Sequence, residues 1–518
     1  MALRIYNSYT KQKEDFQPRR PDIVDMYNCG PTVYNFNHIG NFRSYVSVDV
    51  LRRYLLLRGY KVNHATNITD VEDKIIARSR EAGQDIRTFT EPFVRAFLED
   101  LELLRVQDVE HRPRATDSIP EMLEMIKELE EHGHTYDADG NVYFRLKTFT
   151  NYGKLSDLDT SNLKTAADGR FEADEYEKDD ARDFALWKKT EADEPGWESA
   201  WGTGRPGWHL ECSAMIRGIY GKDGVDIHLG GIDLLFPHHE NEIAQSCCAY
   251  PHDNFVRYWM HNEHLLVDGK KMSKSAGNYF TLRDLTREEL LEPLVKQGNL
   301  PEFFLDLVRE GKMPGAIRYL LLSVHYRTKL NFTFDNIRAG ASAVDRLQGL
   351  VWRLLDITGL SPEDLEAKSA KHKAKPGKRG DNLLPADSEA GKAMAAFIEA
   401  MDDDLNTARA FASVFEFLHE INSALKADSL NKKAATRSLQ YFHEINRILD
   451  LISFEPPPAQ DAPEVDSELA AQVEQLIADR AAAKKAKNFA EADRIRDELT
   501  AMGIQVIDTP DGATWKQV

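Results

Sequence analysis

The first part of the chain alternates short patterns typical of strands with a longer pattern typical of a helix. Residues 22–28 (DIVDMYN) alternate polar and apolar side chains, as the two faces of a strand require. Over residues 41–57 the apolar side chains recur every three or four positions, which predicts a helix that Gly59 ends. Residues 60–66 (YKVNHAT) have the pattern of a second strand. A strand, a helix and a strand joined by short connections predict a βαβ unit and hence a parallel sheet.

A second helix is expected directly after this unit. Thr69 and Glu72 have the spacing of a capping box, in which each side chain bonds a free backbone N–H of the first turn, and this box would open a helix over residues 71–80. We therefore expect a Rossmann-like domain that is built from two separate parts of the chain. The same pattern returns later in a strand at 225–229 (VDIHL), a helix at 239–249 and a strand at 264–267.

The segments between and after these two parts differ from them. Residues 136–207 are rich in Asp, Gly, Trp and Lys with little helical period, which is typical of an insertion, whereas the chain after Gly315 has helical periodicity. The predicted class is α/β: a Rossmann-like parallel-sheet domain with an inserted connective domain, then a helical bundle and a small C-terminal unit. The predicted ranges are 1–135 and 208–314 for the two halves of the Rossmann-like domain, 136–207 for the insertion, 315–455 for the bundle and 466–518 for the last unit.

Composition and charge add a few constraints. The chain has 518 residues, and its apolar residues never run for the length of a membrane span, nor does its start resemble a signal peptide, so we expect a cytoplasmic protein without membrane contact. Four cysteines are too few for a disulfide framework and favour a metal or catalytic role. The net charge of −19 repels polyanions in general, but a local basic face can still contact nucleic acid, so charge does not decide that question.

Two short motifs carry the first signs of chemistry. His38-Ile-Gly40-Asn41 lies where a strand leads into a helix, the edge at which open α/β sheets bind ligands and where free N–H groups favour phosphate. Lys271-Met-Ser-Lys274-Ser is a basic loop past a strand, and such a loop can close over a triphosphate. Each motif alone also fits a helix cap or a solvated turn. Both motifs together, at the two ends of one α/β domain, favour nucleotide chemistry.

A third group of residues could hold a metal ion. His238 and Glu242 lie four positions apart on a predicted helix and therefore share a face. Cys29 and Cys212 would add two thiolates, and thiolate, imidazole and carboxylate are all zinc ligands. The spacing alone leaves a second interpretation open, because the two cysteines are 183 residues apart (212 − 29). In that interpretation the thiols are buried and free, and the glutamate lies on a helix surface.

The motifs resemble those of the class I aminoacyl-tRNA synthetases. His38-Ile-Gly-Asn41 is similar to the HIGH motif, and residues 271–275 are KMSKS letter for letter. The contexts CGPTVY, NITDVEDKI, DFALWK, GRPGWHLECSAM and FPHHENEIAQS resemble the cysteinyl-tRNA synthetases, and the likeness continues to NFAEADRIRDEL and DTPDGATW near the end of the chain. The resemblance implies a monomeric cysteine–tRNA ligase. Such an enzyme activates L-cysteine with ATP and Mg²⁺ to cysteinyl-adenylate and transfers it to the 3′ end of tRNA-Cys.

The resemblance also assigns a role to each candidate residue. It implies one zinc ion per chain that binds the thiolate of the substrate, a soft ligand that the hydroxyl of serine cannot replace, so that no editing domain is required. The implied zinc ligands are Cys29, Cys212, His238 and Glu242; Thr69, Trp208, His228 and His261 are assigned to the substrate cysteine; Gly40, Gly230 and Asp233 to ATP; and His38, Asn41, Lys271 and Lys274 to catalysis, with Lys274 on the phosphates.

Two positions qualify these assignments. Asn41 stands where the HIGH motif has its second histidine; an asparagine donates a hydrogen bond but carries no proton, and we expect the reaction to survive because it depends on positioning and electrostatics. In the last unit, Arg480, Lys484 and Lys487 have the spacing of one basic helix face. The resemblance implies that this region reads the anticodon, and a merely solvated face is the other interpretation.

Two other functions fit parts of the sequence. The cysteine ligase of mycothiol synthesis resembles this family but passes the adenylate to an amino-sugar, and it lacks the C-terminal unit found here at 466–518. A non-catalytic tRNA- or zinc-binding relative has no need to keep His38, Lys274 and the full set of candidate ligands. Pyrophosphate exchange with cysteine or serine, followed by charging of tRNA, separates the three functions.

Overall fold

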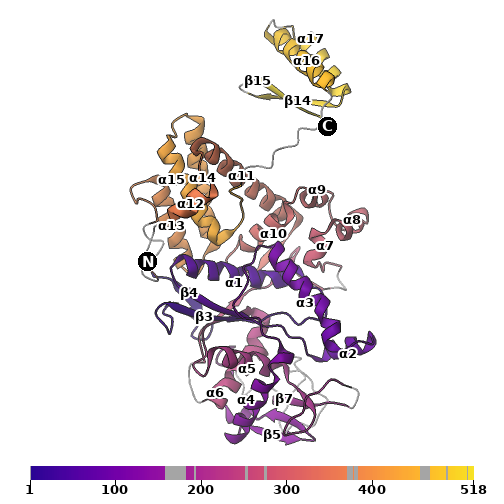
Figure 1. Ribbon diagram of the computed structural model, residues 1–518, viewed down its shortest axis with the longest axis vertical. Helices are drawn as coiled ribbons and strands as arrows, with labels where there is room; N and C mark the ends of the chain where they lie inside the picture. Colours follow the sequence, from indigo (N-terminus) through magenta and orange to yellow (C-terminus); the bar gives the residue numbers. More distant parts are fainter. Residues whose placement is uncertain are drawn as a thin grey trace. The chain divides into compact units, whose positions relative to one another are not determined.

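The structure is a computed structural model that describes residues 2–157, 182–191, 194–250, 255–273, 277–369, 377, 383–455, 467–485, 488–509 and 512–517. The chain divides into two compact units, Met1–Phe454 and Glu455–Val518. The first unit contains the sheet, the helices that cover it and a helical bundle, and the second is a small unit of two helices and two strands (Figure 1).

A four-stranded parallel sheet in the order β10-β9-β3-β4 lies within the first unit. Strand β3 pairs with β4 on one side and with β9 on the other, so the two predicted parts of the Rossmann-like domain share one sheet. Its strands are almost fully buried, as expected for a parallel sheet covered on both faces. The predicted α/β class is confirmed. The strands are β3 (Ile23–Asn28), β4 (Lys61–Thr66), β9 (Val225–Gly231) and β10 (Val256–Asn262).

Helix α1 (Ile39–Leu57) connects β3 to β4 and is buried along most of its length. Figure 1 shows it between the sheet and the helices that follow later in the chain. Its buried carboxylate, Asp49, accepts hydrogen bonds from Arg53 Nε at 2.9 Å and from Arg318 Nη2 of α10 (Met313–Leu322) at 2.5 Å. Because an unpaired charge is costly in the interior, this cluster fixes α1 against the helical part of the unit.

The start of helix α2 (Asp73–Glu81) differs from the prediction. Its N-cap is Glu72, whose Oε2 accepts a hydrogen bond from the backbone N–H of Lys74 at 2.9 Å. The hydroxyl of Thr69 instead donates to Glu211, so the predicted capping box is wrong. The Thr69 side chain, which would have capped the helix, is instead hydrogen-bonded in the interior of the domain. Helix α3 (Ile86–Leu103) follows α2.

The strand predicted at 264–267 belongs to a separate small sheet. Strand β11 (Leu265–Val267) pairs with β12 (Lys270–Lys271) and with β13 (Leu330–Phe332), outside the four-stranded sheet. Arg43 of α1 holds the connection from β10 to β11, because its Nη1 donates to the carbonyls of Glu263 and His264 at 2.7 and 2.8 Å. The basic loop at 271–275 therefore begins at a segment anchored to α1.

The segment predicted as an insertion contains an antiparallel sheet in the order β5-β6-β7-β8. Its strands are β5 (Thr135–Ala138), β6 (Asn141–Phe144), β7 (Phe184–Lys189) and β8 (Gly204–Pro206), and residues 158–181 lie outside the described part. A hydrophobic cluster that includes Trp187 and Phe144 continues into helices α4 (Ile119–Glu131), α5 (Trp208–Tyr220) and α6 (Glu240–Ala249). The insertion thus packs on the helices that carry Cys212 and Glu242.

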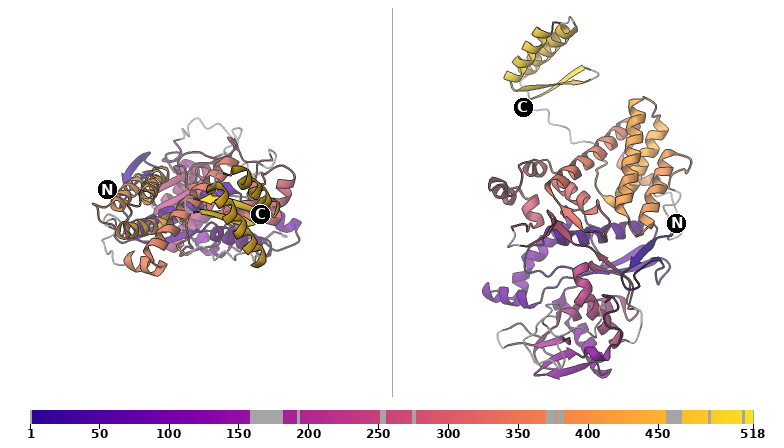
Figure 2. Two further views of the ribbon diagram at one scale, coloured as in Figure 1. Left: turned by 90° about the horizontal axis from the view of Figure 1, so that it is seen from above. Right: turned by 180° about the vertical axis from the view of Figure 1, so that it is seen from behind.

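The rest of the first unit is mostly helical, as predicted (Figure 2). Strands β1 (Arg4–Asn7) and β2 (Gln12–Asp15) form a separate antiparallel pair near the start of the chain. None of the described helices combines the length and apolar character needed to cross a bilayer. The remaining helices are α7 (Leu282–Thr286), α8 (Glu288–Lys296), α9 (Phe303–Arg309), α11 (Phe334–Thr358), α12 (Pro362–Ser369), α13 (Glu389–Asp402), α14 (Thr407–Lys426) and α15 (Lys432–Leu449).

The second unit pairs helices α16 (Ser467–Lys485) and α17 (Phe489–Ala501) with a ribbon of β14 (Ile504–Thr509) and β15 (Gly512–Gln517). Its small core contains Val473, Ile495, Leu499 and Ile504. The basic face predicted on α16 is wrong at Arg480, whose side chain is buried with only 8% exposed. Lys487, at the end of that predicted face, lies outside the described residues.

Candidate active site

A cavity of about 510 Å³ opens beside the carboxyl ends of the parallel strands β3, β4 and β9. This is the edge at which open α/β sheets bind ligands. Most of the predicted site residues line this single space, although they come from both halves of the sheet domain. The predicted residues in its wall are Cys29, His38, Gly40, Asn41, Thr69, Trp208, Cys212, Asp233, His238 and Lys271.

The four predicted metal ligands lie together in or directly behind this wall. The ligand atoms of Cys29, Cys212, His238 and Glu242 all lie within 4.8 Å of one another. The two sulfur atoms are 3.8 Å apart. Two sulfurs that each lie about 2.3 Å from a tetrahedral zinc are separated by roughly the same distance. Glu242 Oε1 is buried and lies 3.1 Å from His238 Nε2, so the carboxylate and the imidazole face each other within the group.

The elements explain how residues so far apart in sequence meet. Cys29 directly follows β3, and Cys212 lies in the first half of α5. His238 lies in an irregular turn, Leu235–His239, that leads into α6, and Glu242 lies in the first turn of that helix. His238 Nδ1 is 3.0 Å from His209 Nδ1, which leaves Nε2 for the cluster. The ring of Trp208 stacks on His238 with centroids 4.5 Å apart.

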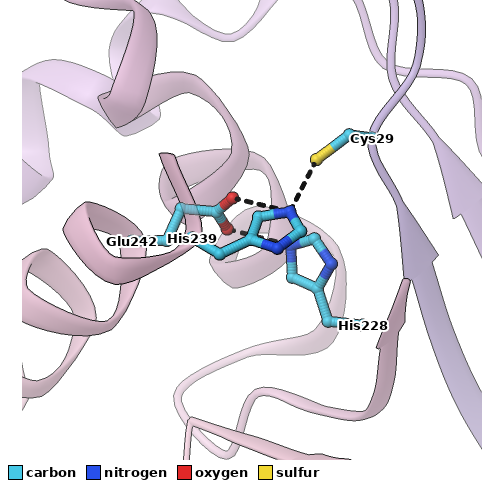
Figure 3. Close-up of side chains that lie close together, drawn as sticks. All are labelled: Cys29, His228, His239 and Glu242. Carbon is cyan, nitrogen blue, oxygen red and sulfur yellow. Dashed lines mark hydrogen bonds and ion pairs between the residues drawn. The ribbon is translucent and has the colours of Figure 1, made fainter. Parts of the chain in front are cut away.

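A second set of side chains shares Cys29 and Glu242: the ligand atoms of Cys29, His228, His239 and Glu242 also lie within 4.8 Å of one another (Figure 3). His239 Nε2 is 3.4 Å from Cys29 Sγ, and His228 Nε2 is 3.0 Å from Glu242 Oε2. Figure 3 shows these side chains pointing toward one another from β9, from the turn Leu235–His239, from α6 and from the end of β3. His239 was not among the residues predicted from the sequence, where only the first histidine of the pair, His238, was a candidate. Its neighbour in the chain, His238, was the signal that could have found it.

Two of the residues assigned to the substrate lie behind the cavity wall. His261 Nε2 is 2.7 Å from His239 Nδ1, and His261 Nδ1 is 2.8 Å from the hydroxyl of Ser8. His228 is fully buried and stacks on Trp259 at 4.6 Å. A Cβ on Gly230, assigned to ATP, would lie 2.6 Å from the ring of His239. These positions support the cluster from behind rather than face the cavity.

The cluster has the charge distribution of a cation site. Burial raises the pKa of the Cys29 thiol well above its ordinary value, and the hydrogen bond from Cys29 lowers the pKa of Cys212 to about 6, so the pair holds one shared proton near neutral pH. Burial opposes charge on Glu242, but His228 and His238 lower the pKa of its carboxyl to about 2. A site with a thiolate and a buried carboxylate, beside a second thiol, fits a divalent cation that prefers sulfur.

Thr69 belongs to a hydrogen-bond chain that links three segments of the wall. Asn67 Oδ1 accepts from the backbone N–H of Gly30 at 2.7 Å, and Asn67 Nδ2 donates to Thr69 Oγ1 at 3.2 Å. The Thr69 hydroxyl donates to Glu211 Oε2 at 2.8 Å. Gly30 follows Cys29 and Glu211 precedes Cys212. These hydrogen bonds therefore connect the two segments that carry the cysteines. Glu211 was not predicted from the sequence, because an acidic residue on a helix next to a cysteine carries no signal of burial.

The other motif lies at the N-terminus of α1. His38 is the N-cap residue, and its backbone N–H donates to Asn41 Oδ1 at 3.1 Å. His38 Nδ1 is buried without a hydrogen-bond partner, and burial lowers the pKa of the ring. Gly40 leaves room for the basic loop, because a Cβ there would lie 2.7 Å from Cε of Met272. The free N–H groups at this helix end suit a phosphate. Lys271 is exposed at the cavity, and Lys274 lies outside the described residues.

Comparisons with known proteins agree with this geometry. The family model of the class I (C) tRNA synthetase catalytic domain matches residues 15–294, and the DALR domain matches 396–453. The cysteinyl-tRNA ligase anticodon-binding domain matches 466–515. Over the full length of both chains, the protein is 44% identical to the cysteine–tRNA ligase of Leptospira interrogans. The chain belongs to the cysteinyl-tRNA synthetase family. The family predicted from the motifs is confirmed.

Other cysteinyl-tRNA synthetases match as completely. The cysteine–tRNA ligase of Solibacter usitatus is 44% identical over 517 residues, and that of Thermococcus onnurineus is 40% identical over 525, each with 100% of both chains covered. Among solved structures, the Mycobacterium tuberculosis methionyl-tRNA synthetase with methionyl-adenylate has a TM-score of 0.55 at 15% identity, covering 83% of this chain and 92% of its own. This likeness shows that the cysteinyl-tRNA synthetase fold here is the class I fold.

Proposed function

We propose that the protein is a cysteine–tRNA ligase that selects its amino acid through a zinc-bound thiolate. The observation that carries the proposal is the single cavity that holds both the N-terminus of α1 and the cluster of Cys29, Cys212 and His238. A nucleotide phosphate and a soft cation can thus be bound side by side in one site. The full-length similarity to cysteine–tRNA ligases supports the same function.

The zinc ion would be held by Cys29, Cys212, His238 and Glu242. When bound, zinc supplies a Lewis acid that favours a thiolate ligand over a hydroxyl. The residues around it do the rest: Trp208 and His209 orient His238, and the chain from Asn67 to Glu211 holds the hydroxyl of Thr69 at the wall. We infer that Thr69 and Trp208 contact the substrate cysteine, because both line the cavity next to the cluster.

In the first reaction, the carboxylate of cysteine attacks the α-phosphorus of ATP, and the bond from this phosphorus to the bridging oxygen breaks. Pyrophosphate leaves and cysteinyl-adenylate remains. The groups proposed to stabilise the charge on the phosphates are the N–H groups at the start of α1, His38, Asn41, Lys271 and Lys274, together with Mg²⁺. In the second reaction, a hydroxyl of the 3′-terminal ribose of tRNA-Cys attacks the acyl carbon, and AMP leaves. We propose that the enzyme acts as a monomer.

The roles of the remaining ATP residues follow from their places. Asp233 lines the cavity in the short helix after β9, and Gly40 allows close approach of the phosphates. Gly230 is proposed to act indirectly, because its lack of a side chain admits the ring of His239. The C-terminal unit is proposed to contact the anticodon arm of tRNA-Cys, in agreement with the domain that matches it.

Pyrophosphate exchange with cysteine and with serine tests the proposal. We expect exchange with cysteine and discrimination against serine beyond the ~200-fold that a cavity contact alone provides. Charging of tRNA-Cys should follow, and Lys274→Ala should lower the adenylation rate with little change in cysteine affinity. Exchange with another amino acid, or cysteine transfer to an amino-sugar instead of tRNA, would overturn the proposal.

A further inference from the structure

The cavity has a rim that the reactions described above do not use. Tyr34, Phe36 and Lys74 line the cavity together with three of the candidate metal ligands, so that one continuous space joins them. Phe36 is 40% exposed. Among the described residues, it is the only aromatic side chain in the group of large hydrophobic side chains that are more than a third exposed. An aromatic ring exposed at the mouth of a binding cavity offers a flat apolar face on which a partner can stack.

Phe36 is held in place although it is exposed. Its ring packs edge to face on Phe93 of α3, with centroids 5.3 Å apart, and the guanidinium of Arg283 lies 5.5 Å from the ring. Arg283 is itself fixed by Glu99 at 2.7 Å and Asp100 at 3.1 Å, so its charge is compensated. The ring is therefore a preorganised surface that needs little ordering when a partner binds.

Two cations stand beside the second aromatic side chain of the rim. The guanidinium of Arg78 lies 4.9 Å from the centroid of Tyr34, and Lys74 Nζ lies 5.6 Å from it. Both residues are exposed on α2, and neither forms an ion pair with a carboxylate in the part of the chain that the structure describes. The neighbouring acid Asp73 is paired with Arg205 at 2.5 Å. In a chain of net charge −19, these uncompensated cations form a local site for an anion.

We propose that this rim, composed of Tyr34, Phe36, Lys74 and Arg78, binds the unpaired 3′ end of the tRNA. The inference rests on the proposed function, since it names where the second substrate enters. Exposed aromatic rings interleaved with cations are the features that bind single-stranded nucleic acid, because bases stack on the rings and phosphates pair with the cations. A nucleotide that stacks on Phe36 would lie at the mouth of the cavity, and the terminal ribose would extend inward toward the adenylate.

The test compares substitutions at Phe36 that keep or remove the ring. Phe36→Tyr keeps an aromatic surface, whereas Phe36→Leu keeps apolar bulk without a ring; Ile357→Ala, on the exposed part of α11, is the matched control. We expect Phe36→Leu to slow single-turnover transfer from preformed cysteinyl-adenylate to tRNA-Cys by roughly 5- to 100-fold relative to the adenylation rate, and Phe36→Tyr to restore it. The control should change neither rate.

Binding of two tRNA transcripts gives a second readout. One transcript is full length and the other lacks its unpaired 3′ nucleotides. The wild type should bind the full transcript more tightly, and Phe36→Leu should lose this difference. Lys74→Ala and Arg78→Ala should each lower the slope of log K against log salt by about 0.7, the value for one phosphate contact on a single strand. Lys127→Ala, an exposed lysine of α4, is the control.

The outcomes separate the inference from the proposed function. If the wild type does not exchange pyrophosphate with cysteine, the proposed function is wrong. If the wild type charges tRNA-Cys but Phe36→Leu transfers at the normal rate and keeps the preference for the full transcript, the rim is not the binding surface. A rise in the KM for ATP in Phe36→Leu, with transfer unaffected, would assign the ring to the adenine of ATP and overturn the inference.

Discussion

Asn41 accepts a hydrogen bond from the backbone N–H of His38 through its side-chain oxygen, at 3.1 Å. This bond satisfies one of the free N–H groups at the start of α1, so Asn41 has a structural role at the position where the common motif has a histidine. Its NH2 group forms no hydrogen bond within the described residues, and Asn41 lines the cavity. The side-chain oxygen of Asn41 therefore caps the helix, while its NH2 group can donate to a ligand in the cavity.

Substitutions of Asn41 can separate these tasks. Asn41→Asp keeps the oxygen that caps the helix but replaces the donor by a negative charge, so we expect a nearly unchanged melting temperature and a strongly reduced adenylation rate. Asn41→Ala loses both groups and should cost about 1 kcal/mol of stability and about 1–3 kcal/mol of transition-state stabilisation. Asn41→His should retain activity. Pre-steady-state adenylation and thermal unfolding of the three variants measure both effects; a fully active Asn41→Asp enzyme would show that only the cap matters.

The metal cluster makes a prediction about cysteine substitutions. We expect one tightly bound zinc per chain and, in Cys212→Ser, loss of zinc together with loss of cysteine activation, because a hydroxyl is a weak zinc ligand. Cys248→Ala removes a buried thiol outside the cluster and should keep both. Metal analysis by mass spectrometry and pyrophosphate exchange provide the two readouts. A metal-free enzyme with full activity would contradict the prediction.

The hydrogen-bond chain through Thr69 gives a prediction that does not depend on metal. Thr69→Val removes the hydroxyl and leaves two groups, Asn67 Nδ2 and Glu211 Oε2, without their partner. Each unpaired buried group costs about 1–3 kcal/mol, so the two together should make the variant less stable by about 2–6 kcal/mol, and it should bind cysteine more weakly. Thr69→Ser keeps the hydroxyl and serves as control. Chemical denaturation and the KM for cysteine measure the result, and equal behaviour of both variants would exclude the role of the hydroxyl.

His64 predicts a dependence of stability on pH. It is buried in β4, with Nε2 2.7 Å from Asn28 Oδ1, and burial lowers the pKa of its ring to about 3. Between that value and the ~6.5 of an unfolded histidine, only the unfolded chain binds the proton, so stability rises with pH across this window and is fully present above it. The loss from pH 7 to 5 is roughly 2 kcal/mol for this group.

The matched variant for this prediction is His64→Gln, which cannot titrate. Its melting temperature should fall less between pH 7 and pH 5 than that of the wild type, whatever its stability at pH 7. Thermal unfolding across this range measures the difference. Parallel curves for the two proteins would show that His64 does not titrate as its burial requires.

The sequence predicted much of the sheet domain, because the alternation around β3 and the periodicity of α1 reflect local contacts with the core. The prediction failed where a side chain bonds a residue that is far away in the sequence. Thr69 has the spacing of a cap, yet its hydroxyl bonds Glu211, 142 residues away. The roles of His239 and Glu211 depend on burial by other segments, which no local pattern reports. The proximity of Cys29 and Cys212 was predicted only from the resemblance to the family, because residues so far apart in the sequence show no periodic pattern.

The candidate ligands are spread from residue 29 to residue 242, and this has a consequence during synthesis of the protein. The first thiol leaves the ribosome long before its partners, and the site cannot be complete until α6 has emerged behind the whole insertion. Metal uptake must therefore follow translation of that helix, although it need not wait for the bundle or the C-terminal unit. Until then, the thiol of Cys29 has none of the buried surroundings that raise its pKa in the folded chain, so the growing polypeptide is most open to oxidation in this interval.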